Sequence, residues 1–250
     1  MSHTVEVCCY TVQDVLKAHH AGAHRVELCA DRTAGGTTPS SGLIEWVIDQ
    51  IPIDLAVMIR PRGGDAVYSR EELAVMKRDI EIAGRLGAHS VVFAVLDETG
   101  FLDIGPMKEL VALAKSYEME IACHRAFDRA RNPQKFLHEL IGLGVNRLLT
   151  SGQKPTAVEG VSLLRELIEI ADGKLSIMPG GGVRGTNLQP LLELDITEIH
   201  TGSAKIQKTD VNVYQHEVYL GSPVHDDSQQ LIVDHQDVAL IVKAMEAKTR

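Results

Sequence analysis

Two glycine-rich turns near the end of the chain have the composition of an anion-binding site. The first, residues 180–182, consists of three consecutive glycines, and the second joins Gly202 to Ser203. Consecutive glycines are unfavourable inside a helix or strand, but they suit a turn whose backbone comes close to a ligand. Glycine turns after two successive strands are typical of the phosphate site that (β/α)8 barrels build after strands 7 and 8. The backbone amides of Gly181, Gly182, Gly202 and Ser203 are therefore predicted to bind an anion, unless these turns are only tight strand-to-helix connections.

Several segments with the pattern of strands carry charged side chains on only one face. Successive side chains of a strand point to opposite faces, and strands covered by helices should present their apolar face to the helices. The charged face is therefore predicted to point into the barrel. Because buried charges must be paired, the inward side chains should form a paired network. They are Glu6, Arg25, Glu27, Arg60, His124, Glu198 and His200.

The place of each charged residue along its segment separates candidate functional groups from structural ones. Residues that begin a segment should lie at the closed end of the barrel, where a structural role is expected. Arg60, His124 and His200 end their segments, and barrel active sites are built at those ends. With Glu27, which lies in mid-strand and could equally be structural, they are the candidate catalytic residues. His124 or Glu27 would be the acid or base, and Arg60 and His200 would orient a substrate.

Two of the four cysteines are placed where they could bind a metal ion together. Cys8 and Cys29 fall on the inward faces of the first two segments, so neighbouring strands could bring their sulfurs within a few ångströms. Two thiolates form a soft site that prefers Cu(I) or Zn(II). Free cysteine is also a common small core residue, and this alternative stays open. Cys9 and Cys123 fall on the outward faces.

Eight apolar segments alternate with helical patterns along the chain. Alternating strands and helices of this length imply a parallel sheet with right-handed crossovers, and eight such units predict a (β/α)8 TIM barrel. The strands are expected at residues 4–9, 25–29, 54–60, 90–96, 120–126, 146–150, 174–178 and 198–201. The helices between them are expected near residues 12–21, 42–50, 70–86, 105–116, 133–143, 157–171 and 186–194.

The pattern breaks after the eighth strand. Residues 205–235 have no clear helical period and are predicted to form an inserted arm, and a last helix is expected at 236–247, capped by Asp234. The whole chain, 1–250, is expected to form one domain. The arm carries too many apolar residues to remain exposed to solvent, so it should cover the barrel mouth or pack on a second subunit. A symmetric homodimer is favoured because it is the commonest assembly.

Charge, hydropathy and cysteine content argue against several classes of protein. The net charge of −9 argues against a nucleic-acid partner, which requires basic clusters. The longest apolar runs fall short of the ~20 residues of a membrane span, and the N-terminus lacks the pattern of a signal peptide. The four cysteines show neither CxxC nor a disulfide spacing, which indicates free thiols in a reducing cytoplasm.

Six motifs in order make the chain similar to the CutC family, named for copper homeostasis. They are Val26-Glu-Leu-Cys29, Gly35-Gly-Thr-Thr-Pro39-Ser, Met58-Ile-Arg-Pro-Arg-Gly-Gly-Asp65, His124-Arg-Ala-Phe-Asp128, Leu149-Thr-Ser-Gly152 and Met178-Pro-Gly-Gly-Gly182. The resemblance extends over about residues 4–204 and implies a TIM barrel, a cytoplasmic location and a role in copper handling. It also implies that Cys8 and Cys29, which match the cysteines of the family's "VC" and "ELC" motifs, are the ligands of a copper ion as Cu(I).

The sequence is therefore consistent with two functions. The first is a cytoplasmic copper-binding protein of copper homeostasis. The second is a TIM-barrel enzyme acting on a small phosphorylated or carboxylated metabolite, which an interior rich in arginine and histidine and the glycine turns would suit.

Overall fold

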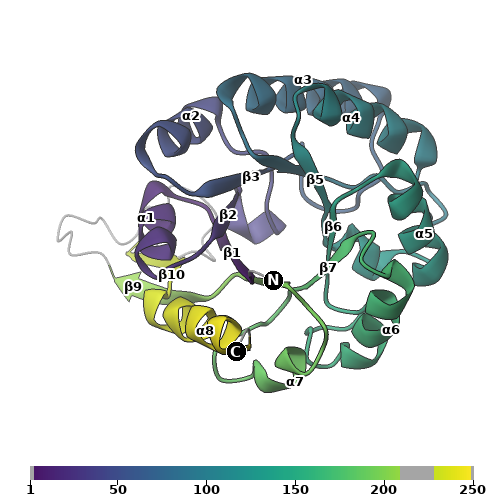
Figure 1. Cartoon of the computed structure of the whole chain (residues 1–250). Coiled ribbons are helices and arrows are strands. Elements are labelled where there is room, and N and C mark those ends of the chain that lie inside the picture. Colours follow the sequence, from purple (N-terminus) through teal and green to yellow (C-terminus); the bar gives the residue numbers. More distant parts are fainter. Residues whose placement is uncertain (1–2, 209–227, 249–250) are drawn as a thin grey trace.

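The computed structural model describes residues 3–208 and 228–248, and this part of the chain forms a ring of eight parallel strands enclosed by helices (Figure 1). Hydrogen bonds join the strands in the order β7-β6-β5-β4-β3-β2-β1-β8, and the ends of this series meet to close the barrel. The predicted (β/α)8 barrel is confirmed. The strands are β1 (Thr4–Cys9), β2 (Arg25–Leu28), β3 (Asp54–Met58), β4 (Ser90–Val92), β5 (Glu120–Cys123), β6 (Arg147–Thr150), β7 (Ser176–Pro179) and β8 (Glu198–Thr201).

The helices begin and end where local sequence signals place them. The α3 helix begins with a capping box between Ser69 and Glu72, and Asn132 caps the start of the α5 helix, whose first residue is Pro133. Gly87 and Gly144 close α3 and α5 in the left-handed conformation. The helices are α1 (Val12–His20), α2 (Ser41–Gln50), α3 (Arg70–Leu86), α4 (Ile104–Ser116), α5 (Pro133–Leu143), α6 (Val161–Ala171), α7 (Gln189–Leu192) and α8 (His235–Lys248), with short 3-10 helices η1 (Arg32–Ala34) and η2 (Arg125–Arg129).

The two faces of the strand ring have different environments. The outward faces pack on the helices in a large apolar core that includes Val5, Val7 and Cys9. Within the ring, the apolar side chains form a separate and much smaller cluster of Cys8, Cys29, Ala56, Met58, Val92 and Ala122. The rest of the interior is available to polar groups. No helix in the described part of the chain has both the length and the apolar character required to cross a membrane.

Several expected elements are shorter than predicted, among them the fourth strand, expected at 90–96, which covers only Ser90–Val92. β3 and β5 end at Met58 and Cys123, so Arg60 and His124 lie just beyond the strand ends and not within the strands. The seventh helix, expected at 186–194, covers only Gln189–Leu192. The side chain of Asn187 accepts a hydrogen bond from the Arg184 amide and donates one to the Gly182 carbonyl, which holds this stretch in a turn.

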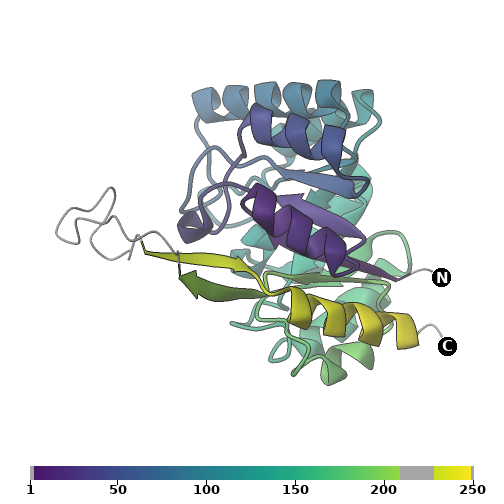
Figure 2. The ribbon, with the colours of Figure 1, turned by 90° about the vertical axis from the view of Figure 1, so that its left-hand side faces the viewer.

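The ends of the predicted irregular arm are regular, which corrects that expectation. β9 (Ala204–Lys208) and β10 (Gln229–Val233) pair as an antiparallel ribbon, and residues 209–227 of the arm lie outside the described part. Figure 2 shows the ribbon projecting from the end of the barrel opposite to the start of β1. The last helix is confirmed as α8, and Asp234 accepts a hydrogen bond from the Gln236 amide at its start.

Candidate functional site

The carboxyl ends of the strands open into a cavity of about 730 Å³. Its strand-borne lining includes three buried side chains, Cys8 from β1, Glu27 from β2 and His200 from β8. The connecting loops supply glycines and arginines. Arg60, His124, Gly181, Gly182 and Gly202 also line the cavity, so it brings together most of the residues that the sequence singled out.

The predicted inward thiols lie next to each other. The Sγ atoms of Cys8 and Cys29 are 3.8 Å apart, and both residues belong to the small cluster inside the ring. Cys29 also donates a weak hydrogen bond to a carboxylate oxygen of Glu27, at 3.6 Å. Cys9 and Cys123 pack in the outer core, as the alternation of the strands predicted.

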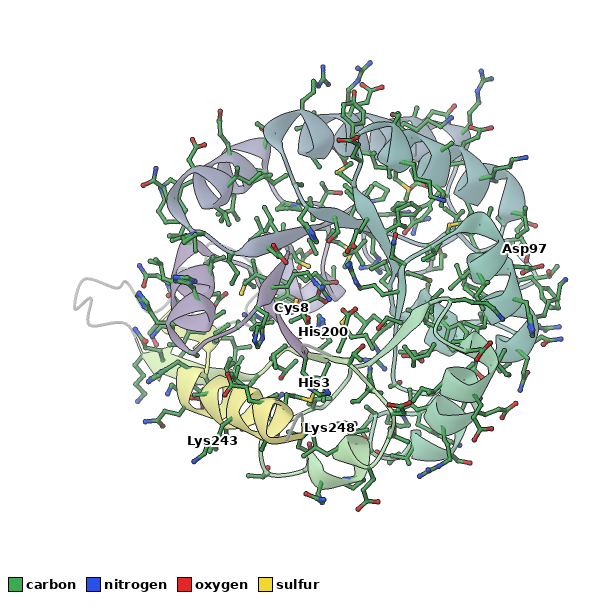
Figure 3. The ribbon with its side chains drawn as sticks, in the orientation of Figure 1. His3, Cys8, Asp97, His200, Lys243 and Lys248 are labelled. Atoms are coloured by element: carbon green, nitrogen blue, oxygen red, sulfur yellow. The ribbon has the colours of Figure 1, made fainter. Side chains whose placement is uncertain are left out.

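Two more metal-ligating groups surround Cys8. Its sulfur, a carboxylate oxygen of Glu27 and an imidazole nitrogen of His200 all lie within 4.8 Å of one another. Figure 3 shows Cys8 and His200 near the centre of the strand ring. His200 Nδ1 is 2.8 Å from Glu6 Oε1, which fixes the orientation of the ring, and His200 Nε2 is 3.9 Å from Glu27 Oε2. The sequence had assigned Glu27 and His200 to catalysis and had not associated them with the thiols.

The electrostatics of this cluster favour a charged Cys8. The hydrogen bond shared with Cys29, and an interaction with His200, lower the pKa of the Cys8 thiol well below its usual value. The same bond, together with burial, raises the pKa of Cys29. Burial disfavours the His200 imidazolium, but the charge of Glu27 and the contacts with Cys8 and Glu6 outweigh it and raise the His200 pKa. Within the pair, loss of a proton is therefore favoured at Cys8 and disfavoured at Cys29.

A buried ion-pair network lies behind the cluster and confirms much of the predicted pairing. Arg25 contacts both Glu6 and Glu198, and Glu6 in turn holds His200. Burial opposes ionisation of Glu6, but the charge of Arg25 and the contact with His200 lower its pKa to about 2. The sequence reading missed Arg147, a buried arginine that pairs with Glu120 and lies 3.3 Å from Glu198. Arg147 and the apolar Leu148 are successive residues of β6 and point to opposite faces. This alternation could have identified Arg147 as an inward-facing charge.

Arg60 and His124 lie outside this network, which corrects the prediction that they would be paired with charges. Arg60 donates to the carbonyl oxygens of Ala34, Gly36 and Gly64 at 2.7 to 3.0 Å, and no carboxylate of the described residues forms an ion pair with it. His124 Nδ1 accepts from the amide of Ala126, and its buried Nε2 has no hydrogen-bond partner within the described chain. Burial and the nearby charge of Arg60 lower the pKa of His124 to about 4.

Three of the four residues predicted to bind an anion line the cavity, and the fourth, Ser203, does not. Gly181 and Gly182 adopt φ angles of +104° and +69°, which side chains rarely tolerate, and both line the cavity with Gly202. Ser203 does not line it, because its amide donates to Thr201 Oγ1 and its hydroxyl donates to Asp237. Ser203 is therefore removed from the predicted anion-binding set.

Comparison with known proteins finds relatives over most of the chain. The profile of the CutC family matches residues 3–206. A human protein named "Copper homeostasis protein cutC homolog" is 40% identical over 87% of this chain and 80% of its own length. The family protein CutC of Photorhabdus laumondii is 43% identical over 81% of this chain and 80% of its own length.

Solved structures agree with this relationship. A CutC crystal structure from Streptococcus agalactiae has a TM-score of 0.75 and 31% identity, covering 80% of this chain and 98% of that chain. A thiamine phosphate pyrophosphorylase from Pyrococcus furiosus has a TM-score of 0.61 over 99% of this chain and 97% of that chain. Its 13% identity shows a shared fold alone.

Proposed function

The chain belongs to the CutC family, and from this premise we propose that it is a copper homeostasis protein that binds Cu(I) through Cys8 and Cys29. The observation that carries the proposal is the pair of buried thiols 3.8 Å apart inside the barrel. Relatives that share about two fifths of their residues with this chain are named as copper homeostasis proteins, which supports the same role here.

The donor set fits a soft metal ion. Two metal–thiolate bonds of ~2.3 Å each can span up to ~4.6 Å, so sulfurs 3.8 Å apart are within reach of one ion. Sulfur ligands favour Cu(I) over harder ions, and a low pKa at Cys8 reduces the cost of losing its proton on binding. Cys8 and Cys29 would hold the ion, and His200 or Glu27, whose ligand atoms lie within 4.8 Å of the Cys8 sulfur, would supply a further ligand.

The alternative of an enzyme acting on a small anionic metabolite is less well supported. Glu27 and His200, two of its four candidate catalytic residues, lie within metal-binding distance of Cys8. Arg60 is held by backbone carbonyls and His124 is neutral. The human relative is named for copper homeostasis and the Photorhabdus laumondii relative for the CutC family, and the copper role accounts for the thiols.

We further propose that the protein works in the cytoplasm as a homodimer. The four cysteines are all free and buried, which suits a reducing compartment. At the base of the arm, Ile206 and Leu231 face each other across the ribbon and are 63% and 50% exposed. Such an exposed apolar pair supports contact with a second copy of the chain.

Anaerobic titration with Cu(I) against a chromophoric chelator tests the copper site. We expect about one tightly bound ion per chain. Cys8→Ser and Cys29→Ser should each abolish it, because a single thiolate cannot replace the pair. Cys9→Ser and Cys123→Ser are matched controls, since both thiols are equally buried but lie in the outer core. Copper binding that persists in both Cys8→Ser and Cys29→Ser would remove the basis of the proposal.

A further inference from the structure

We propose that the cavity at the barrel mouth is also a binding site for a small organic anion, which it holds through a carboxylate or phosphate group beside the thiol pair. This site does not depend on copper. The cavity of about 730 Å³ is within the ~300–1,000 Å³ range of small-molecule sites. A single metal ion at the thiols would leave most of this volume to another ligand.

The first support is a fixed positive charge in the cavity wall. Arg60 is held rigidly by three carbonyl oxygens, those of Ala34, Gly36 and Gly64. Carbonyls orient a guanidinium without neutralising it, and no carboxylate of the described residues is within ion-pair distance. A guanidinium held in this way is preorganised to bind a carboxylate or phosphate.

Further arginines gather at the same wall, in a chain whose net charge is −9. Arg184 donates only to the carbonyl oxygen of Val183 within the described chain and has no acidic partner there. Arg125 is paired with Asp128, yet it lies against Gly181, where an added Cβ would be 3.0 Å from its Cζ. The unneutralised charges of Arg60 and Arg184 are therefore concentrated at the cavity.

The lining contains five arginines, Arg32, Arg60, Arg125, Arg129 and Arg184, and four acidic residues, Glu27, Asp65, Asp97 and Glu98. Asp65 is engaged by Arg62 at 3.0 Å, and Asp97 accepts hydrogen bonds from the amides of Thr99 and Phe101 in its own loop. Glu27 is buried at the thiol cluster, where its Oε2 lies 3.6 Å from Cys29 Sγ and 3.9 Å from His200 Nε2. Arginines therefore outnumber acidic residues in the lining, and Arg60 and Arg184 are among those without an ion-pair partner in the described residues.

The second support is a set of donors without acceptors. The amides of Gly181 and Gly182 have no hydrogen-bond acceptor within the described chain, and both glycines line the cavity. His124 accepts from the Ala126 amide at Nδ1, so in the neutral ring the proton is on Nε2, which lacks an acceptor. A buried donor without a partner is unfavourable.

These donors and charges together define the chemistry of the ligand. Backbone amides, a neutral imidazole donor and unneutralised guanidinium groups all bind oxygen atoms that carry negative charge. The sources of such an oxygen are a carboxylate or a phosphate group. The part of the ligand that does not bind these donors would extend toward the thiol cluster.

Titration of the uniformly 15N-labelled protein with inorganic phosphate and, separately, with succinate tests this site by NMR. We expect saturable shifts of the Gly181 and Gly182 amides, and the probe that binds more tightly identifies the preferred group. Arg184→Gln should weaken binding roughly tenfold, as expected for the loss of a charge-assisted hydrogen bond. Arg60→Lys is a second variant that keeps the charge but loses the two-pronged geometry, and it should also bind more weakly.

Two further proteins complete the test. Arg85→Gln removes an arginine from the exposed surface of α3 and should bind both probes as the unmodified protein does. Cys8→Ser should keep anion binding even where it loses copper, which separates this proposal from the copper site. Shifts that do not saturate, that spread over the surface away from these glycines, or that are unchanged in both Arg184→Gln and Arg60→Lys would overturn it.

Discussion

Cys8 lies between a second sulfur and an imidazole, and these two neighbours determine its chemistry. Cys29, which directly follows β2, places its sulfur 3.8 Å from that of Cys8, and His200 approaches from β8. Parallel pairing places Glu6 opposite His200 and Cys8 opposite Glu27, so four side chains from three strands converge. Alternation along each strand predicts that these side chains face inward. The alignment of one strand against the next cannot be read from the sequence, and the metal-ligating cluster was missed for that reason.

Replacing Glu6 with glutamine should strongly destabilise the protein. The change leaves the shape of the side chain nearly intact, but it deprives the buried Arg25 and His200 of an anionic partner. Breaking a buried ion pair in this way costs about 3 kcal/mol or more, which urea-induced unfolding would measure. Glu109→Gln, which disrupts an exposed pair with Lys77, is the matched control and should unfold at nearly the same urea concentration. Equal effects of the two substitutions would contradict the prediction.

At the scale of elements, one carboxylate holds three parts of the chain together. Asp14 in α1 is fully buried and accepts hydrogen bonds from the amide of Tyr10, the amide of Val233 in β10 and the guanidinium of Arg32. The sequence predicts α1 from its apolar period. It does not predict the ribbon of β9 and β10, because their solvent-exposed residues lack regular alternation. These strands depend on pairing and on contacts far away in the sequence.

Removing the Asp14 carboxylate should therefore loosen β10 while leaving the barrel folded. In Asp14→Ala the Val233 amide loses its buried acceptor, at a cost of about 1–3 kcal/mol. Hydrogen exchange followed by mass spectrometry should show exchange in residues 229–233 that is faster by about tenfold or more. Peptides from β3, β4 and β5 should change little, and Asp49→Ala on the exposed face of α2 serves as a control. Uniform loss of protection, or none, would show that Asp14 is not a local anchor.

For the molecule as a whole, the spacing of apolar residues was enough to predict the barrel. In each strand and helix this spacing shows which face is buried. The contacts of the side chains at the barrel mouth were predicted less well. Arg60 and His124 were expected as partners in a charge network, yet Arg60 binds backbone carbonyls of two loops. Such contacts depend on loop conformations that no local pattern encodes. A local sequence pattern does not predict the oligomeric state either, because the proposed dimer contact is made by the arm.

The proposed dimer can be tested at the described base of the arm. The double substitution of Ile206→Ser and Leu231→Ser removes the exposed cross-strand apolar pair without touching the barrel core. Light scattering coupled to size exclusion should then give the mass of a monomer where the unmodified protein gives that of a dimer. Val75→Ser, which removes an equally exposed apolar residue from α3, should leave the dimer intact. A monomeric unmodified protein would exclude the homodimer directly.

The stability of the whole fold should depend on pH through His124. Burial and Arg60 lower its pKa to about 4 in the folded protein, from 6.5 when unfolded, so the unfolded chain binds the proton more readily. The contribution of the neutral ring is therefore complete above pH 6.5 and is lost as the pH falls toward 4. A difference of about 2.5 pKa units corresponds to ~3 kcal/mol. Glu6 contributes in the same direction only below pH 4.5, because its pKa falls from 4.5 to about 2.

The window between pH 6.5 and pH 4.5 contains the contribution of His124, and comparison with a His124 variant separates it from the opposing contribution of Glu27, whose raised pKa makes stability fall as the pH rises. His200 has a raised pKa and has the opposite sign, so its stabilisation is fully present in this window and is lost only as the pH rises through its folded pKa. In His124→Gln the free energy of unfolding of the metal-free protein should rise less from pH 4.5 to pH 6.5 than in the unmodified protein. His138→Gln, on the exposed surface of α5, should leave the pH profile unchanged. If His124→Gln keeps the full pH dependence, the neutral state of His124 is not what stabilises the barrel near neutral pH.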